Sequence, residues 1–160
     1  HFVTPFAIKD LNENIELPYE FGVAASEYDI DEGKSDRSDD VSYYIESGDR
    51  ETYGFSGYPD YACTYRFTYF DSSNPKTTLF GFKVGDSMEK ADKQLRKHKY
   101  TRGIIDESGC IYYRGKIEIY IDIFLIDNSY NVKDYIKNGE VISYSIEIRS
   151  TDKQRKGNYK

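Results

Sequence analysis

The architecture of this chain is decided by one stretch, which reads Leu79-Phe-Gly-Phe-Lys-Val-Gly-Asp-Ser-Met-Glu-Lys-Ala-Asp-Lys-Gln-Leu95. Residues 77–84 predict a strand, and a tight glycine turn follows it. Asp86 then stands at the N-cap position with Glu89 three residues on, a spacing typical of a capping box. We therefore expect a strand, a turn and then a helix over about residues 87–98.

The expected helix has one narrow apolar stripe, formed by Met88, Ala91 and Leu95, whose spacing places them on one face. Lysine and arginine residues cover the rest of its surface and gather at its C-terminal end, where cations suit the helix dipole. We predict that this helix is the longest in the chain and that it packs on one face of a sheet.

Alternating apolar residues after the helix predict three strands, at residues 110–113, 117–126 and 141–149. The second has apolar residues on both faces, which is typical of a central strand covered on both sides. In the third we expect alternate apolar side chains to point inward, namely Ile142, Tyr144, Ile146 and Ile148.

Fewer regular elements are predicted before residue 77. Residues 41–46 and 61–70 read as strands, and residues 6–20 are consistent with an extended segment crossing onto the core. The polar stretch 27–40 predicts an exposed loop, and residues 48–60 predict a turn region rich in glycine and tyrosine.

These patterns predict an α+β fold: a mostly antiparallel twisted sheet with one main helix packed on one face. Aromatic residues make up 16 % of the chain, with 17 Tyr, 9 Phe and no Trp, and such residues suit strands. We expect a single domain over residues 1–160. It would comprise an acidic β-rich portion at about 1–76, a strand, helix and β-meander portion at about 77–150, and a basic tail at 151–160.

Charge is distributed unevenly along the chain, whose net charge is −6. Residues 1–62 carry 15 Asp and Glu against four Lys and Arg, whereas the remainder carries 13 against 18. Either two solvated faces differ in sign, or the acidic portion lies against the basic one. The acidic front argues against nucleic acid as the main partner. The longest apolar run, residues 123–126, is far short of the roughly 20 residues that span a bilayer.

Two cysteines, Cys63 and Cys110, lie on expected strands. An oxidising compartment would let them pair, and a reducing one would leave them as buried thiols, so both outcomes stay open. The chain opens at His1 without an initiator methionine, and we expect that an upstream segment has been removed.

Two segments resemble a known kind of domain. Residues 81–100 (Gly-Phe-Lys-Val-Gly-Asp-Ser-Met-Glu-Lys-Ala-Asp-Lys-Gln-Leu-Arg-Lys-His-Lys-Tyr) and 139–148 resemble the helix-plus-meander repeat of uncharacterised secreted or lipoprotein domains of Gram-positive bacteria. A similar unit occurs in the β-lactamase inhibitor protein fold and in small outer-membrane assembly lipoproteins. Residues 6–18 look like the N-terminal half of the same secreted domains. The resemblance covers about half of the chain. It implies an extracytoplasmic location, a binding or envelope role and room for a lipid anchor upstream, and it supplies no catalytic residues.

Two serine motifs resemble those of known enzymes. Gly85-Asp-Ser-Met88 resembles the nucleophile block of the Gly-Asp-Ser-Leu esterases, but their Asp-x-x-His is missing, and the only later histidine, His98, lies on the cationic helix. Ser87-Met-Glu-Lys90 matches the Ser-x-x-Lys of penicillin-interacting enzymes without their other motifs. Helix capping therefore explains Asp86 and Ser87 better, and we predict no catalytic residue and no cofactor.

The acidic loop does not fit an EF-hand. If Asp29 takes the first ligand position, Lys34 falls where glycine is required and Asp40 where the bidentate glutamate belongs. A looser calcium site remains an alternative to a solvated loop, using aspartates chosen from Asp29, Asp31, Asp36 and Asp39. No His or Cys cluster has zinc spacing, and we predict no metal site.

Eight aromatic residues lie within 27 positions: Tyr43, Tyr44, Tyr53, Phe55, Tyr58, Tyr61, Tyr65 and Tyr69. Exposed tyrosines supply rigid amphipathic area for protein or sugar ligands. We predict that Tyr53, Tyr58 and Tyr61 form a recognition patch, and that Tyr65 and Tyr69 fill the core.

The sequence thus favours a non-enzymatic extracytoplasmic binding or interaction domain of a bacterial secreted protein or lipoprotein, with a protein or carbohydrate ligand at the envelope. The alternative is a small carboxylate-dependent hydrolase acting on cell-wall or glycan substrates, because the separation of two carboxylates is a property of the tertiary structure. A hydrolase needs converging acidic groups with a raised pKa, whereas a binding domain needs an exposed aromatic patch.

Overall fold

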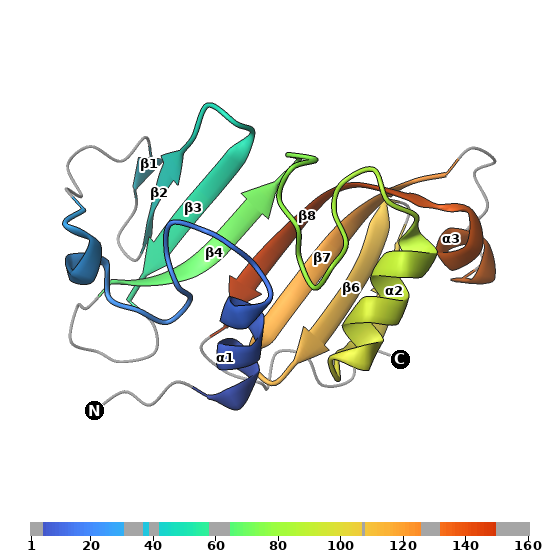
Figure 1. The fold of residues 1–160 in the computed structure, drawn as a ribbon, viewed down its shortest axis with the longest axis horizontal. Helices are drawn as coiled ribbons and strands as arrows, with labels where there is room; N and C mark the ends of the chain where they lie inside the picture. The colour runs from blue at the N-terminus through green and yellow to red at the C-terminus, as the bar shows by residue number, and fades with distance from the viewer. Residues whose placement is uncertain are drawn as a thin grey trace.

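The structure is a computed structural model that describes residues 5–30, 37–38, 42–57, 65–106, 108–125 and 132–149. Its described strands form one antiparallel sheet in the order β1-β2-β3-β4-β8-β7-β6-β5 (Figure 1). The strands are β1 (Arg37–Ser38), β2 (Ser42–Glu46), β3 (Glu51–Ser56), β4 (Arg66–Ser72), β5 (Thr101–Ile105), β6 (Gly109–Arg114), β7 (Ile117–Phe124) and β8 (Glu140–Ile148). The α+β class and the antiparallel sheet agree with the sequence prediction.

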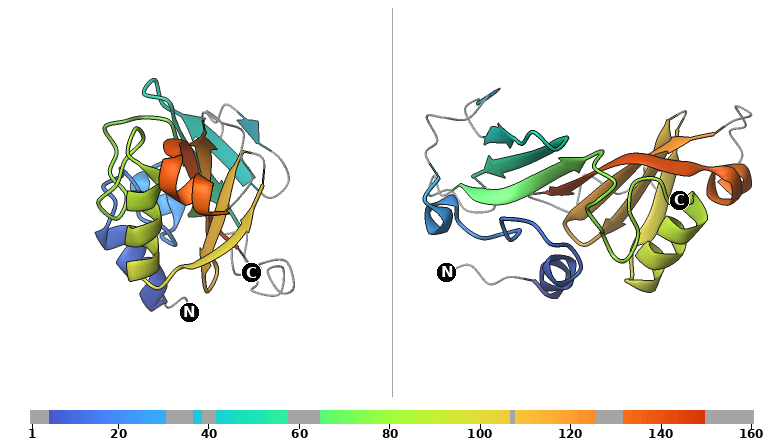
Figure 2. Two further views of the ribbon diagram at one scale, coloured as in Figure 1. Left: turned by 90° about the vertical axis from the view of Figure 1, so that its right-hand side faces the viewer. Right: turned by 45° about the horizontal axis from the view of Figure 1, so that its top comes forward.

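The described helices are short: α1 (Phe6–Glu13), α2 (Met88–Lys97), α3 (Val132–Asn138) and the 3-10 helix η1 (Ala25–Tyr28). Figure 2 shows α1 and α2 on the same side of the sheet. The helix expected at 87–98 is α2, the longest of the described helices, and its three apolar stripe residues are fully buried. Because α1 and α2 both cover this face of the sheet, the predicted single main helix does not cover it alone.

The N-cap of α2 is Ser87 and not Asp86, so the predicted capping box is wrong by one residue. The Ser87 hydroxyl accepts a hydrogen bond from the backbone N–H of Lys90 at 3.1 Å. The Asp86 carboxylate instead accepts from the backbone N–H of Lys83 at 3.0 Å and pairs with the ammonium groups of Lys83 and Lys90. Asp86 therefore closes the turn that precedes the helix.

Two predictions for the first 60 residues are wrong. Residues 6–13 form a helix rather than an extended segment, because Ile8 and Leu11 bury one helical face against the sheet. The stretch 48–60, predicted as a turn region, contains the buried strand β3, which pairs with both β2 and β4. Gly54 has a steric role there, since a Cβ at this position would lie 2.7 Å from the Cβ of Tyr69.

The predicted strand at 77–84 is absent. Leu79 makes only isolated bridges, with Ile15 and Phe82, and φ is positive at Phe80 and Gly81. The segment between β4 and α2 winds over the helix-bearing face of the sheet (Figure 1), where Leu79, Phe80 and Phe82 are buried. The apolar side chains of this stretch are buried, but the chain turns there instead of pairing as a strand.

The core lies between this face of the sheet and the cover of α1, α2 and residues 79–82. Strand β7 points Ile117, Ile119, Ile121 and Ile123 into it, while the alternate residues of β7 are not fully buried, so covering on both sides is wrong. In β8 the alternation breaks, since Val141 is buried and Ile142 is 45 % exposed. A register shift between β7 and β8 causes this, because Ile123 pairs with Val141 while Asp122 pairs with Ser143.

Candidate functional site

Most side chains on the opposite face of β4, β7 and β8 are polar; the exposed Phe124 of β7 is an exception. Successive residues of a strand point to opposite faces, so the neighbours of the buried residues in β4, β7 and β8 lie away from α1 and α2. We call these residues the polar sheet face: Tyr69, Asp71, Tyr120, Asp122, Ser143, Ser145 and Glu147.

Strand pairing brings these side chains together. Ser145 of β8 pairs with Asp71 on one side and with Tyr120 on the other, so the three form one row across the sheet. The neighbouring rows contain the pair Ser143 and Asp122 and the pair Tyr69 and Glu147. Adjacent strands lie about 4.8 Å apart, and a ligand could therefore touch several of these groups at once.

Hydrogen bonds orient the side chains of the polar sheet face. The Tyr69 hydroxyl donates to Asp71 Oδ2 at 3.1 Å, and the Ser143 hydroxyl donates to Asp122 Oδ2. The Tyr120 hydroxyl donates to Asp106 Oδ1 at 3.0 Å and lies 2.7 Å from the hydroxyl of Ser108. Each aspartate of the face is thus held by a neighbouring hydroxyl.

Burial shapes the electrostatics of this face. It raises the pKa of Asp71 above the ordinary value near 3.8; the Tyr69 hydrogen bond opposes this shift, and the charge of Asp122 adds to it. Burial, followed by the negative charge of Asp71, also raises the pKa of Tyr69. Burial similarly raises the pKa of Tyr120 to about 12. At neutral pH both phenols are therefore neutral and can donate hydrogen bonds.

The tyrosine predictions meet different outcomes. Tyr53 was expected at the surface but is only 7 % exposed, with its ring stacked on Phe70 at 5.5 Å and its hydroxyl donating to Glu51 at 3.1 Å. Tyr58 and Tyr61 lie outside the described residues, so nothing here tests their predicted binding role. Tyr65 is partly buried against the core, packing on Tyr43.

Tyr69 was predicted to fill the core but lies on the polar sheet face. The sequence contained a signal for this placement. Asp71 has the same parity along β4 as Tyr69, whereas Phe70 alternates with both and is fully buried. A face that carries an aspartate two residues away is more consistent with the polar side of the strand.

Ser87 and His98 do not form a catalytic pair. They cap opposite ends of α2, and a rise of about 1.5 Å per residue separates them by about 16 Å along the helix axis. The Ser87 hydroxyl is engaged in the N-cap hydrogen bond, and His98 Nδ1 lies 3.0 Å from Asp10 Oδ2. His98 therefore does not act as a general base for Ser87.

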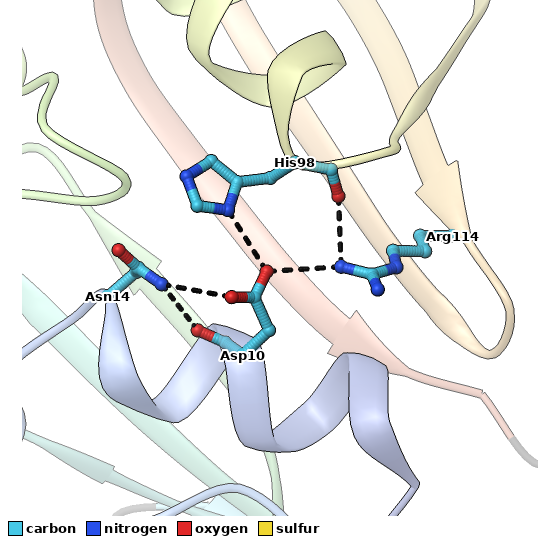
Figure 3. A network of polar contacts seen from close by, with 4 residues as sticks. All are labelled: Asp10, Asn14, His98 and Arg114. Atoms are coloured by element: carbon cyan, nitrogen blue, oxygen red, sulfur yellow. Dashed lines mark hydrogen bonds and ion pairs between the residues drawn. The ribbon is translucent and has the colours of Figure 1, made fainter.

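A second polar network joins α1 to the rest of the molecule (Figure 3). Asp10 Oδ2 accepts a hydrogen bond from the Arg114 guanidinium at 3.0 Å, and the same arginine nitrogen donates to the carbonyl of His98 at 2.9 Å. Asn14 donates to the backbone carbonyl of Asp10 at 2.7 Å. Here an acidic residue of the N-terminal portion does lie against the basic remainder, and the contact fastens α1 to the end of α2 and to the β6–β7 turn.

The remaining chemical predictions concern a metal site, the two cysteines and a membrane span. Within the described ranges, no three His, Cys, Asp or Glu residues are placed to hold a metal ion. Asp31, Asp36 and Asp39 of the acidic loop and Cys63 lie outside those ranges. Cys110 is a buried free cysteine, and burial raises the pKa of its thiol to about 12. No helix in the described part of the chain is long and apolar enough to cross a membrane.

Comparison with known proteins gives no match for this chain. No protein-family model matches the sequence, no curated protein matches it, and no solved structure matches the fold.

Proposed function

We propose that this chain is a non-enzymatic binding or interaction domain of a bacterial secreted protein or lipoprotein, acting outside the cytoplasm, and that the polar sheet face is its recognition surface. One observation carries the proposal: Tyr69 with Asp71, and Tyr120 with Asp122, flank β8 on the face opposite α1 and α2. Tyrosines and carboxylates held by hydrogen bonds on regular strands form a rigid, pre-oriented surface.

The chemistry of this face favours a cationic protein ligand. It carries the carboxylates of Asp71, Asp122 and Glu147, while at its margin Arg149 lies 2.6 Å from Glu118 and 3.3 Å from Glu147. The raised pKa of Asp71 means that its ionised form is disfavoured by burial and by Asp122. An incoming lysine or arginine would relieve that cost, and tyrosine rings add favourable cation–π contacts.

The proposed surface can be tested with a short oligoarginine peptide as the probe, titrated at low ionic strength while backbone amide NMR signals are followed. We expect the shifts to concentrate in β4, β7 and β8. Asp71→Asn and Asp122→Asn should each weaken binding about fivefold, because each removes one attractive charge worth about 1 kcal/mol.

Asp49→Asn is the matched control, because it makes the same change in the exposed β2–β3 turn. If Asp49→Asn weakens binding as much as Asp71→Asn does, the peptide senses only net charge and the proposed surface is wrong. Shifts confined to other strands would lead to the same conclusion. If a glycan oligomer displaces the peptide from β4, β7 and β8, the ligand of this face is a carbohydrate and not a protein.

A hydrolase remains the second candidate because a specific observation favours it. Asp71 has a raised pKa and lies near the charge of Asp122, and a general acid that works beside a second carboxylate needs a raised pKa. Incubation with peptidoglycan fragments, followed by measurement of new reducing ends, separates the two functions. We expect no release. Release by the wild type that Asp71→Asn abolishes would establish the hydrolase instead.

The proposed location rests on the resemblance to secreted domains and needs its own test. Intact cells producing the full-length protein can be treated with a membrane-impermeant, lysine-reactive biotin reagent. We expect labelling of this domain, whose α2 carries exposed lysines at 90, 93 and 97. Labelling that occurs only after the cells are lysed would place the domain in the cytoplasm.

A further inference from the structure

A pocket of about 320 Å³ lies between the last turn of α2 and strand β5. The described residues that line it are Arg96, Tyr100, Thr101 and Arg102. It is separate from the polar sheet face, because Arg102 bonds to Asp92 of α2, a helix that covers the other side of the sheet. Two guanidinium groups, those of Arg96 and Arg102, therefore lie beside one small pocket.

The two arginines are held by one buried carboxylate. Asp92 accepts hydrogen bonds at Oδ1 from Arg102 at 2.9 Å and from the Tyr112 hydroxyl at 2.5 Å. Its other oxygen, Oδ2, lies 3.7 Å from a nitrogen of Arg96. The Tyr112 bond fixes the carboxylate from within the core, so Asp92 positions Arg102 by a hydrogen bond and attracts the more exposed Arg96 by charge.

Positive charge exceeds negative charge around this pocket. Residues 93–105 contain five Lys and Arg and no Asp or Glu. Asp92 engages one nitrogen of each arginine, whereas a guanidinium has five N–H donors. The side chain of Arg96 is 57 % exposed and that of Arg102 is 28 % exposed, so both reach solvent.

We propose that this pocket binds the oxyanion group of a small molecule, a phosphate or a carboxylate, between Arg96 and Arg102, with the exposed Thr101 hydroxyl as a further donor. Arginine is suited to this task because its planar fork matches two oxygens of such a group. The pocket volume falls within the range of about 300 to 1,000 Å³ that is usual for small-molecule sites. The proposal is independent of the ligand of the polar sheet face.

The test titrates the protein at low ionic strength with inorganic phosphate and, separately, with succinate, while amide NMR signals of Thr101 and Arg102 are followed. Arg96→Gln should weaken binding about tenfold, which is the effect of losing a charged hydrogen-bond donor. Lys93→Gln is the matched control, since it removes one positive charge from the same helix at an exposed position outside the pocket. It should weaken binding less than about threefold, because Lys93, one helical turn from Arg96, contributes only a nearby charge and no hydrogen-bond donor of the pocket.

Two further variants keep the test independent of folding. Arg96→Lys retains the charge and loses the fork, and Thr101→Val removes only the hydroxyl; each should weaken binding without changing the rest of the spectrum. Tighter binding of phosphate identifies a phosphorylated ligand, and tighter binding of succinate identifies a carboxylate. If neither anion shifts these signals, or if Lys93→Gln and Arg96→Gln weaken binding equally, no such site exists.

Discussion

Tyr53 and Tyr69 show how one position along a strand decides the role of a residue. They lie on the paired strands β3 and β4, where Tyr53 is opposite Phe70 and Tyr69 is opposite Gly54. The two tyrosines therefore face opposite sides of the sheet: Tyr53, predicted at the surface, is in the core, and Tyr69, predicted in the core, is on the polar sheet face. Tyrosine suits both sides because its ring is apolar and its hydroxyl is polar.

Ser87 gives a prediction at the residue scale. Ser87→Ala should lower the free energy of unfolding by about 1 kcal/mol or less, because the variant loses the N-cap hydrogen bond to Lys90. Urea unfolding followed by circular dichroism measures the change. Ser87→Asp is the control and should retain most of the stability, since aspartate also caps helices. If Ser87→Asp is as unstable as Ser87→Ala, the cap does not explain the serine.

At the scale of elements, the helices depend on what they contact. Helices α1 and α2 have 8 and 10 residues, below the roughly 12 to 15 residues at which isolated helices become even marginally stable in water. Their stability must therefore come from packing and from polar contacts such as that of Asp10 with Arg114 (Figure 3). No side chain caps the N-terminus of α1, whereas Ser87 caps that of α2, so this contact matters more for α1 than for α2.

Asp10→Asn tests the attachment of α1. The variant should lose about 1 kcal/mol of unfolding free energy, because a half-buried charged hydrogen bond to Arg114 is replaced by a weaker one. Amide hydrogen exchange should accelerate in α1 more than in the β-strands. Glu13→Gln makes the same chemical change at an exposed position of the same helix and should leave exchange almost unchanged. Equal acceleration in both variants would show that Asp10 does not fasten the helix.

At the scale of the whole molecule, the two faces of the sheet differ in what they contribute. The helix-bearing face buries isoleucine, phenylalanine and tyrosine side chains and supplies the hydrophobic stabilisation. The polar sheet face instead holds Asp71 partly buried near Asp122, which opposes ionisation. Such a face contributes little hydrophobic stabilisation, because its side chains are polar and are hydrogen-bonded to one another.

Asp71 makes stability depend on pH in a defined direction. Its folded-state pKa lies above the unfolded value near 3.8, so the folded protein holds the proton more tightly. This contribution is fully present below that value and is lost as the pH rises through the folded-state pKa. Asp71→Asn should therefore gain stability relative to the wild type as the pH rises from below 3.8 to 7. Urea unfolding of both proteins across this pH range measures the difference.

Asp49→Asn is the control for this prediction, because it makes the same chemical change in an exposed turn, and the stability of Asp71→Asn should change with pH more than that of this variant. The proposed electrostatics of the face would be wrong if Asp71→Asn lost stability relative to the wild type as the pH rose from 3 to 7.

The sequence by itself determined the elements whose pattern is long and regular. The stripe of Met88, Ala91 and Leu95 has helical spacing, and the isoleucines of β7 alternate over eight residues, so local periodicity is sufficient to identify both. For the candidate site, the alternation of Phe70 with Tyr69 and Asp71 was a local signal of the same kind.

Only the tertiary structure decided the shorter elements and the partners of the site. Strand β3 has Gly54 at its centre and is stabilised by pairing on both sides, and α1 is held by burial of Ile8 and Leu11; neither cause is visible in a local pattern. The position of Asp122 near Asp71 and that of Arg102 beside Asp92 depend on which distant segments pair. Local periodicity specifies conformation, whereas contacts between distant residues follow from how the core is closed.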